Sequence, residues 1–383
     1  MIRFEQLPEL SLYVHLPWCV RKCPYCDFNS HEQKSPLPEQ AYIDALIQDL
    51  QSSLPQIWGR PVVSVFIGGG TPSLFSAQGM QRLLSEIRSL VPLIPDAEIT
   101  MEANPGTFDA ERFAGFRDAG VNRLSLGVQS FMDSQLHALG RVHDAEQARR
   151  AIAQAKPLFD RLNIDLMFGL PGQSLKALEA ELDILSSFAP SHVSLYQLTL
   201  EPNTLFAVRP PSGLPDDDLL ADMQSLVIER LAQRGLVRYE ISGFAAPGQE
   251  CRHNLNYWSF GDYLGIGAGA HGKLSFADRI VRTVKPRHPD GFMRQPSEGG
   301  TETPVRPEDL PFEFMLNALR LIQGVPSGRW AQTTGIQVGS HPFLLDRIGV
   351  AQSRGLMSFR PDRFQASARG IELLNDLQSL FLP

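Results

Sequence analysis

The chain has 383 residues, of which 43% are hydrophobic and 20% are charged, so it can hold one large α/β domain with a smaller one beside it. Its formal net charge of −7 argues against nucleic acid as the main partner, because phosphate binding depends on a concentrated positive field. The sequence has no apolar run long enough to span a bilayer, and residues 1–5 do not resemble the start of a signal peptide, so we expect a cytoplasmic protein. Peripheral contact with a membrane through a local patch is left open.

The first predicted strand, residues 11–15, leads into three closely spaced cysteines, which are Cys19, Cys23 and Cys26. One loop with this spacing can wrap three thiolates around a single iron-sulfur cluster and leave one iron without a protein ligand. A structural zinc site is an alternative, but it prefers a closed shell of four ligands, and only Asp27 and His31 lie nearby. A disulfide is less favoured, because four cysteines in the whole chain are too few for a secreted scaffold. The spacing therefore predicts an open iron-sulfur cluster.

From residue 11 to about residue 245, short apolar runs alternate with stretches of helical period. The predicted strands span residues 11–15, 62–67, 98–103, 123–129, 161–168 and 192–198. The predicted helices span residues 39–53, 76–90, 109–119, 144–155, 174–188 and 216–234. This alternation is typical of a parallel sheet with right-handed crossovers, so we predict an α/β fold with a partial (β/α)6 barrel.

Polar residues fall where these strands end. The cysteine loop follows the first strand and Gly68-Gly69-Gly70-Thr71-Pro72 follows the second. The later strands end with or contain Glu102, Gln129, Asp165, Tyr196 and Gln197. Because the carboxyl ends of parallel strands meet at one rim, these residues are expected to converge there. The glycine run by itself indicates only a tight turn, but beside the cysteine loop it indicates backbone that a ligand can approach closely.

The remainder of the chain holds a histidine-aromatic motif and a predicted C-terminal domain. The motif is His253-Asn254-Leu-Asn-Tyr257-Trp258, and Cys251 just before it is interpreted as a buried apolar thiol rather than a ligand. A Pro/Gly-rich stretch at about 285–310 marks a boundary. We divide the chain into a barrel over residues 1–245, an extension with the motif and linker over residues 246–305, and a C-terminal domain over residues 306–383.

The C-terminal domain is predicted to be a small α+β unit. A helical period over residues 312–322 precedes residues 354–359 and 368–375, which indicate a helix, short strands and a terminal helix. This order resembles a winged helix. Because the chain carries so little basic charge, we expect a lid or docking role rather than DNA binding.

The cysteine motif, with Tyr25 before the third cysteine, resembles the signature of the radical S-adenosylmethionine (SAM) superfamily. Residues 12–18 and 24–25 resemble the branch of oxygen-independent coproporphyrinogen III oxidase. The resemblance implies a [4Fe-4S] cluster whose open iron is chelated by SAM, held by Cys19, Cys23 and Cys26. The SAM contacts that it implies are Tyr13, Tyr25, Gly69, Gly70, Thr71, Glu102, Gln129, Arg141 and Asp165. An acid inside an apolar strand, as at Asp165, needs a partner, whereas Arg141 has the alternative of a solvated loop residue.

Phe28 stands where the oxidases of this branch carry a fourth cysteine, and only about a dozen residues precede the first strand. These departures, together with the histidine-aromatic motif, resemble the HemW family of heme chaperones. The resemblance implies heme as a further ligand, because an imidazole can bind heme iron and aromatic rings can pack on a porphyrin face. The heme-binding candidates are His253, Asn254, Tyr257 and Trp258. A structural role for His253 is the alternative.

The function that follows from the resemblance is that of a heme chaperone with a SAM-binding cluster, which hands heme to apo-hemoproteins such as respiratory-chain components. One alternative is an active radical SAM enzyme, such as a divergent coproporphyrinogen III oxidase. Another is a winged-helix regulator that uses the cluster as a redox sensor. Whether SAM is cleaved, which hemoprotein receives heme, which donor supplies electrons and how many chains assemble are left open.

Overall fold

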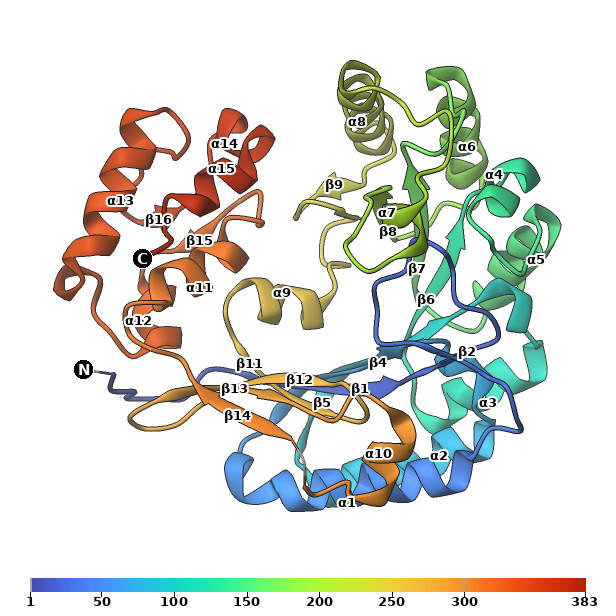
Figure 1. Ribbon diagram of the computed structural model, residues 1–383, viewed down its shortest axis with the longest axis horizontal. Coiled ribbons are helices and arrows are strands. Elements are labelled where there is room, and N and C mark those ends of the chain that lie inside the picture. The colour runs from blue at the N-terminus through green and yellow to red at the C-terminus, as the bar shows by residue number, and fades with distance from the viewer. Residues whose placement is uncertain (1, 299) are drawn as a thin grey trace.

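A twisted sheet of twelve strands runs through the molecule, with helices along its outer face and a smaller helical unit beside one end (Figure 1). The computed structural model describes residues 2–298 and 300–383. The strand order is β14-β13-β12-β11-β1-β4-β5-β6-β7-β8-β10-β9. The two ends of this order do not pair within the described residues, so the predicted partial barrel and α/β class are confirmed.

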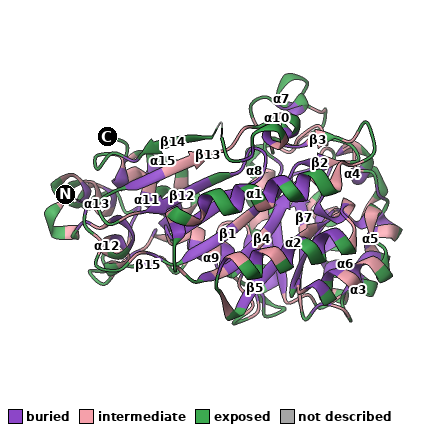
Figure 2. Ribbon diagram, turned by 90° about the horizontal axis from the view of Figure 1, so that it is seen from below, coloured by how far each residue is buried: buried purple, intermediate pink, exposed green. Residues whose placement is uncertain are grey.

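Six parallel strands form the barrel. They are β1 (Leu10–Leu16), β4 (Val62–Gly69), β5 (Leu93–Ala103), β6 (Arg123–Gln129), β7 (Arg161–Phe168) and β8 (His192–Gln197). The crossover helices are α1 (Glu39–Ile57), α2 (Ala77–Leu90), α3 (Ala110–Ala119), α5 (Ala145–Ala155), α6 (Leu175–Ser187) and α8 (Asp217–Ala232). Their outer faces are exposed while the strands behind them are buried (Figure 2). A parallel sheet needs this cover, because its crossovers place helices over strands of continuous apolar sequence.

Most of these helices begin one residue after a capping side chain. The hydroxyl or carboxylate of each cap accepts a hydrogen bond from the backbone amide three residues later, at Ser76, Asp109, Asp144, Ser174 and Asp216. Such caps satisfy amides that have no partner within the helix, which explains why the predicted starts lie at the caps themselves.

Short elements complete the rims of the barrel and the turns around it. The short helices are α4 (Asp133–Ala138), α7 (Leu205–Val208), and single turns at Pro72–Leu74, Pro105–Thr107 and Val338–Ser340. In the cysteine loop, β2 (Trp18–Cys19) pairs with β3 (His31–Glu32). At one edge of the sheet, β10 (Gly243–Ala245) runs antiparallel to β8 and to β9 (Val237–Arg238).

The sheet continues beyond the barrel through residues that the sequence did not identify as strands. These are β11 (Asp262–Ile266), which lies parallel to β1, and the antiparallel β12 (His271–Ser275), β13 (Ile280–Val284) and β14 (Thr301–Pro304). The stretch expected as a Pro/Gly-rich linker thus carries α10 (Pro289–Arg294) and β14. Its polar strand is ordered by pairing with β13, which composition does not reveal. The domain boundaries stay a prediction.

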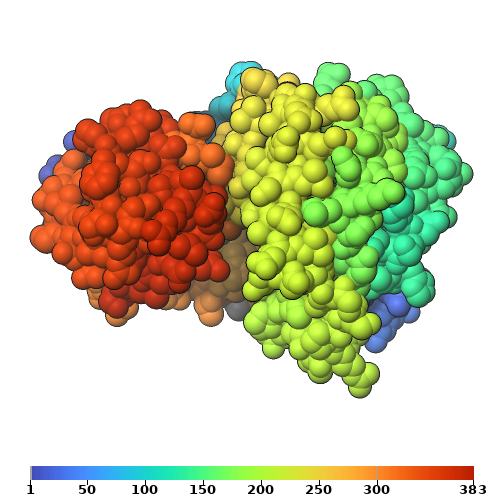
Figure 3. Space-filling model, turned by 90° about the horizontal axis from the view of Figure 1, so that it is seen from above, coloured from blue at the N-terminus to red at the C-terminus, as the bar shows by residue number. Residues whose placement is uncertain are grey.

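The C-terminal residues form a lobe beside the barrel (Figure 3). Its elements are α11 (Leu310–Ala318), α12 (Gly328–Thr334), α13 (Pro342–Ser353), α14 (Ala368–Glu372), α15 (Leu374–Ser379) and the pair β15 (Val325–Pro326) and β16 (Arg363–Phe364). They enclose a separate apolar core around Phe314, Trp330 and Phe381. Among the helices of the described residues, none is long and apolar enough to cross a membrane.

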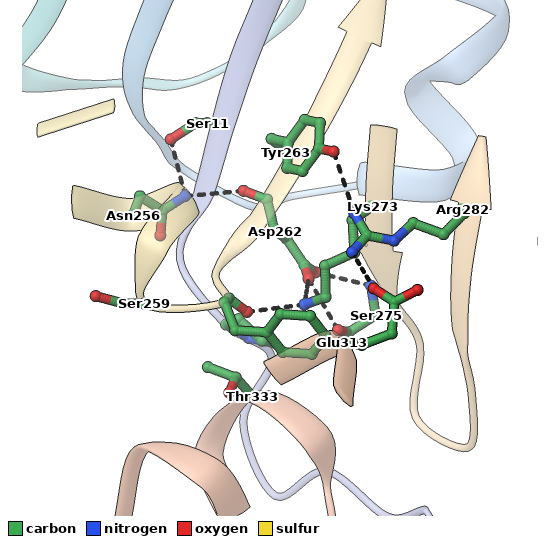
Figure 4. Close-up of polar contacts among 12 residues, drawn as sticks. Ser11, Asn256, Ser259, Asp262, Tyr263, Lys273, Ser275, Arg282, Glu313 and Thr333 are labelled. Atoms are coloured by element: carbon green, nitrogen blue, oxygen red, sulfur yellow. Dashed lines mark hydrogen bonds and ion pairs between the residues drawn. The ribbon is translucent and has the colours of Figure 1, made fainter. Parts of the chain in front are cut away.

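A buried ion network joins β11 to its neighbours (Figure 4). The Asp262 carboxylate accepts from Lys273 Nζ at 2.9 Å, from Arg60 Nη2 at 2.8 Å, and from the amide and hydroxyl of Ser275 at 2.8 Å each. Its backbone carbonyl accepts from Asn256 Nδ2 at 2.9 Å, which attaches α9 (Arg252–Trp258). Burial raises the pKa of Asp262, but the two cations outweigh it and hold the pKa below its usual value. Burial lowers the pKa of Lys273 to about 8 despite the attraction of Asp262.

Removal of this carboxylate is expected to destabilise the fold. In Asp262→Ala the Lys273 ammonium stays buried without its partner, and breaking a buried ion pair costs about 3–5 kcal/mol. Urea unfolding followed by circular dichroism measures the change. The matched control is Asp278→Ala, which removes an exposed carboxylate paired with Arg279 and is expected to leave the unfolding midpoint unchanged. Equal midpoints for both variants would contradict the assigned role.

Candidate functional site

A cavity of about 730 Å³ opens at the carboxyl ends of the barrel strands. It is lined by the three cysteines and by every predicted SAM contact except Tyr13: Tyr25, Gly69, Gly70, Thr71, Glu102, Gln129, Arg141 and Asp165. We call it the cysteine cavity. The structure thus brings together residues that are spread over 147 positions of sequence, from Cys19 to Asp165, because all of them follow or end parallel strands.

The three thiols are half-buried and free, and they come from one loop. Arg141 Nη1 donates to Cys23 Sγ at 3.5 Å, and Cys26 Sγ lies 3.9 Å from the Ser30 hydroxyl. Burial raises the pKa of Cys19 and of Cys26, so the thiolate forms need a positive partner. Three soft sulfur donors facing a guanidinium fit an anionic iron-sulfur cluster. No three or more His, Cys, Asp or Glu side chains of residues 2–298 and 300–383 are arranged to hold a single metal ion.

The glycine run is needed for close packing against the cysteine loop. Gly69 has a φ of +117°, and a Cβ there would lie 2.6 Å from the His15 ring. A Cβ at Gly70 would lie 2.5 Å from the Trp18 carbonyl oxygen. The Gly69 amide donates to Glu102 at 3.1 Å, the Gly70 amide to the carbonyl of Leu16 at the end of β1, and the Thr71 amide to the carbonyl of Trp18 in the cysteine loop. These three amides therefore bind protein atoms, whereas the sequence had suggested that they are open to a ligand.

Two acids lie in the wall of the cysteine cavity. Burial raises the pKa of Glu102 to about 7, the charge of Asp165 adds to the effect, and the Gly69 amide opposes it. Asp165 accepts from Asn163 Nδ2 at 2.7 Å and from Ser125 Oγ at 3.2 Å, yet burial still raises its pKa. Asp165 therefore has the polar partners that a buried acid requires.

Arg141 is half-buried in the wall of the cysteine cavity and donates to protein atoms, so the alternative of a solvated loop arginine is wrong. Besides Cys23, it donates to the Gly127 carbonyl at 2.7 Å. Desolvation lowers the pKa of Arg141, but the nearby Tyr25 and Cys23 raise it by more, so the net pKa is raised. Gln129 ends β6 with a φ of +69°, next to a register shift in the strand. The strand ends there in a turn that no local sequence pattern had marked.

A second cavity, of about 520 Å³, lies next to the first and shares part of its wall. We call it the histidine cavity, and its distinctive lining residues are Tyr13, His15, His253, Tyr257, Tyr263, His271 and Arg287. The shared wall consists of Asp27, Phe28, Phe66, Gly69, Glu102 and Asn254. The structure therefore divides the predicted heme candidates. His253 and Tyr257 face the histidine cavity, Trp258 the cysteine cavity, and Asn254 both.

His253 is anchored on one side of its ring. Its Nδ1 lies 3.2 Å from the Ser64 hydroxyl, and its ring centroid lies 5.0 Å from that of Phe66. No hydrogen bond engages its Nε2 within the described residues. Burial lowers the pKa of His253 to about 4, so the imidazole is neutral at physiological pH. Tyr13, a predicted SAM contact, lies in this cavity instead, with its hydroxyl 2.9 Å from His15 Nδ1.

Several lining residues carried no sequence signal. Arg123 lies within β6, Arg287 lies in the predicted linker, and His271 ends the stretch that follows the histidine-aromatic motif, where the sequence had indicated no role for it. Arg320 reaches the cysteine cavity from the C-terminal lobe and stacks on Trp258 at 4.3 Å from the ring. Cys251 lines neither cavity, and burial raises its pKa to about 12, which agrees with the interpretation as an inert thiol.

Comparisons with known proteins place the chain among radical SAM proteins. Residues 13–185 match the radical SAM superfamily model, and residues 305–373 match the HemN C-terminal domain. The chain is 48% identical to the heme chaperone HemW of Escherichia coli (strain K12), over 98% of this chain and 99% of that protein. It is 35% identical to HemW of Bacillus subtilis (strain 168), over 97% and 99% of the two chains.

Two further matches extend this comparison. The mitochondrial radical S-adenosyl methionine domain-containing protein 1 of Bos taurus is 37% identical over 96% of this chain and 86% of that protein. Among solved structures, coproporphyrinogen III oxidase (HemN) from Escherichia coli aligns with a TM-score of 0.83 over 98% of this chain and 90% of that chain. At 23% identity, this likeness establishes the fold alone.

The raised pKa of Glu102 predicts a pH-dependent stability difference. Between pH 4.5 and pH 7 the folded chain binds a proton at Glu102 that the unfolded chain has lost, so rising pH destabilises the wild type. Glu102→Gln does not titrate, and its stability relative to wild type is expected to increase by about 2–3 kcal/mol from pH 4.5 to pH 8. Urea unfolding of the iron-free, reduced protein at both pH values measures this.

The matched control for this experiment is Glu111→Gln, which replaces an exposed glutamate of α3. Its stability relative to wild type is expected to stay constant across the same pH range. If the stability difference between Glu102→Gln and wild type is also constant across this pH range, the raised pKa of Glu102 is contradicted.

Proposed function

This chain belongs to the HemW family of the radical SAM superfamily, and on that premise we propose that it is a heme chaperone. It binds heme and releases it to apo-hemoproteins, among them components of the respiratory chain. Family membership implies a [4Fe-4S] cluster and SAM. We place its work in the cytoplasm, with peripheral contact to the membrane during delivery. A divergent coproporphyrinogen III oxidase and a DNA-binding regulator are not favoured by the relatives.

The observation that carries the proposal is the imidazole of His253. A metal-binding histidine commonly uses its second ring nitrogen for an orienting hydrogen bond, and His253 Nδ1 lies within reach of Ser64 in this way. Its pKa keeps it in the neutral form that binds iron. The aromatic rings of Phe66 and Tyr257 supply the apolar surface that a porphyrin face requires.

In this proposal the cysteine cavity holds the cluster and SAM. Cys19, Cys23 and Cys26 would hold the cluster, which would leave one coordination position open for SAM. The acids Glu102 and Asp165 accept hydrogen bonds from the ammonium or the ribose hydroxyls of SAM. The positive charge of Arg141 offsets the negative charge of the thiolates, of which Cys23 is in direct contact with it. The remaining proposed contacts are Tyr13, Tyr25, Gly69, Gly70, Thr71 and Gln129.

Cluster ligation predicts a selective loss of iron. Cys19→Ala, Cys23→Ala and Cys26→Ala are each expected to lower iron from about four atoms per chain to less than one after anaerobic reconstitution, because a cluster with two protein thiolates is poorly held. Iron analysis and the visible charge-transfer absorption measure the loss. The control Cys251→Ala removes the fourth thiol and should keep the full iron content. Zinc in place of iron in the wild type would contradict the proposal.

The chaperone function predicts heme transfer without porphyrinogen chemistry. One hemin should bind per chain. Heme-loaded protein should restore the respiratory oxidase activity of membrane vesicles from heme-deficient cells faster than free hemin does at the same concentration. The reconstituted protein with SAM, reductant and coproporphyrinogen III should form no protoporphyrinogen. Formation of that product, with no effect on the vesicles, would instead support the oxidase.

A further inference from the structure

The histidine cavity contains more than the motif histidine. Its volume of about 520 Å³ falls within the range of about 300–1,000 Å³ that is typical of pockets for organic ligands. Five aromatic side chains line it, which are Tyr13, Phe28, Phe66, Tyr257 and Tyr263. A flat apolar macrocycle can contact such a lining across both faces. The cavity therefore offers space and surface that His253 alone does not explain.

Two basic side chains at the cavity have no partner within the described residues. His271, at the start of β12, is exposed, and no hydrogen bond engages its ring. The Arg287 guanidinium is also exposed and takes part in no ion pair or hydrogen bond. The position of Arg287 is nevertheless set, because its backbone carbonyl accepts from Asn29 Nδ2 at 2.9 Å and from His31 Nε2 at 3.3 Å.

The charges around the cavity suit an anionic, iron-bearing ligand. Neither ring nitrogen of His271 makes a hydrogen bond within the described residues, so its imidazole is free to bind a metal. The carboxylates of the lining, Asp27 and Glu102, belong to the wall that is shared with the cysteine cavity. Arg287 lies outside that shared wall and can pair with an acidic group.

We propose that the histidine cavity is the heme site, in which His271 binds the iron together with His253, and Arg287 pairs with a heme propionate. This assignment rests on the proposed heme-binding function and adds its location and two residues. Heme and SAM then occupy separate cavities on either side of Phe28. The wall between them is thin enough to be lined from both sides by the same side chains.

The structure also explains how this site keeps its shape. Tyr263, on β11, lies next to Asp262, and its hydroxyl accepts from Arg282 Nη1 at 3.1 Å (Figure 4). Arg282 in turn pairs with Glu313 of the C-terminal lobe. The Tyr257 ring lies 5.1 Å from the Tyr263 ring. The wall formed by α9 and β11 is thus held in place by the Asp262 network and by the contacts of Arg282 with Tyr263 and Glu313.

The propionate contact is tested with two ligands. Hemin and hemin dimethyl ester, which lacks the propionate charges, are titrated into wild type and Arg287→Ala, and the Soret band is followed. Loss of one charge-assisted hydrogen bond is expected to weaken hemin binding about tenfold and to leave binding of the ester unchanged. The matched control Arg209→Ala removes an exposed arginine elsewhere and should bind both ligands like wild type. Equal hemin affinity in wild type and Arg287→Ala would overturn this contact.

The iron contact is tested by spectrum and rescue. Outer-shell partners of metal ligands are worth about 10- to 100-fold in affinity, so loss of a direct ligand in His271→Ala should weaken hemin binding at least about tenfold and shift the Soret maximum. Added imidazole should restore the wild-type spectrum. His137→Ala, which removes an exposed histidine of α4, is the control. Far-UV circular dichroism and unchanged iron content establish that each variant is folded.

The outcomes separate this inference from the function on which it rests. Failure of wild-type protein to bind hemin would reject the heme chaperone itself. Normal hemin binding with wild-type spectra in both His271→Ala and Arg287→Ala would reject the inference and leave the chaperone function intact. Displacement of bound hemin by saturating SAM would place the heme in the cysteine cavity and would also overturn the inference.

Discussion

The buried carboxylate of Asp262 is the interaction on which the arrangement of the two cavities depends. It lies at the first residue of β11, the strand through which the sheet continues from β1. A charge buried without partners costs several kcal/mol, so the folded state requires both Lys273 from β12 and Arg60 from the loop before β4 to contact the Asp262 carboxylate. Asn256 of α9 binds the same residue, which sets the place of His253. One ionic centre thus positions three separate segments of the chain.

Close backbone packing imposes a second constraint, at the cysteine loop. Gly70 lies so near to the Trp18 carbonyl of the loop, and Gly69 so near to the His15 ring of β1, that neither glycine has room for a side chain. The loop is therefore rigidly supported where its thiols must hold a cluster, and its Phe28 ring, 60% exposed, stands between the two cavities. A cysteine at that position would add a thiol to the shared wall, whereas phenylalanine offers an apolar face to both sides.

The two cavities differ in the charged and polar side chains that line them. The half-buried acids Glu102 and Asp165 and the half-buried cation Arg141 all line the cysteine cavity, which suits a ligand that carries both an ammonium and a carboxylate. The histidine cavity shares Asp27 and Glu102 with it, but adds imidazoles and the Arg287 guanidinium, which has no ion pair or hydrogen bond within the described residues. Two ligands of different charge can therefore be sorted by chemistry as well as by shape. The C-terminal lobe takes part in this division, because Arg320 extends from it to the cysteine cavity.

The sequence by itself determined the barrel and most of one site. The six barrel strands were predicted to within a few residues except at the start of β5, because apolar runs, caps and turns are local signals. Residues at the ends of parallel strands converge by topology alone, which is why the lining of the cysteine cavity could be anticipated. Tertiary structure decided strands β11 to β14, the placement of Tyr13, the contacts of Arg141 and the lining by His271, Arg287 and Arg320. Each of these depends on pairing or ion contacts between segments far apart in the chain, and such contacts leave no periodic pattern in the sequence.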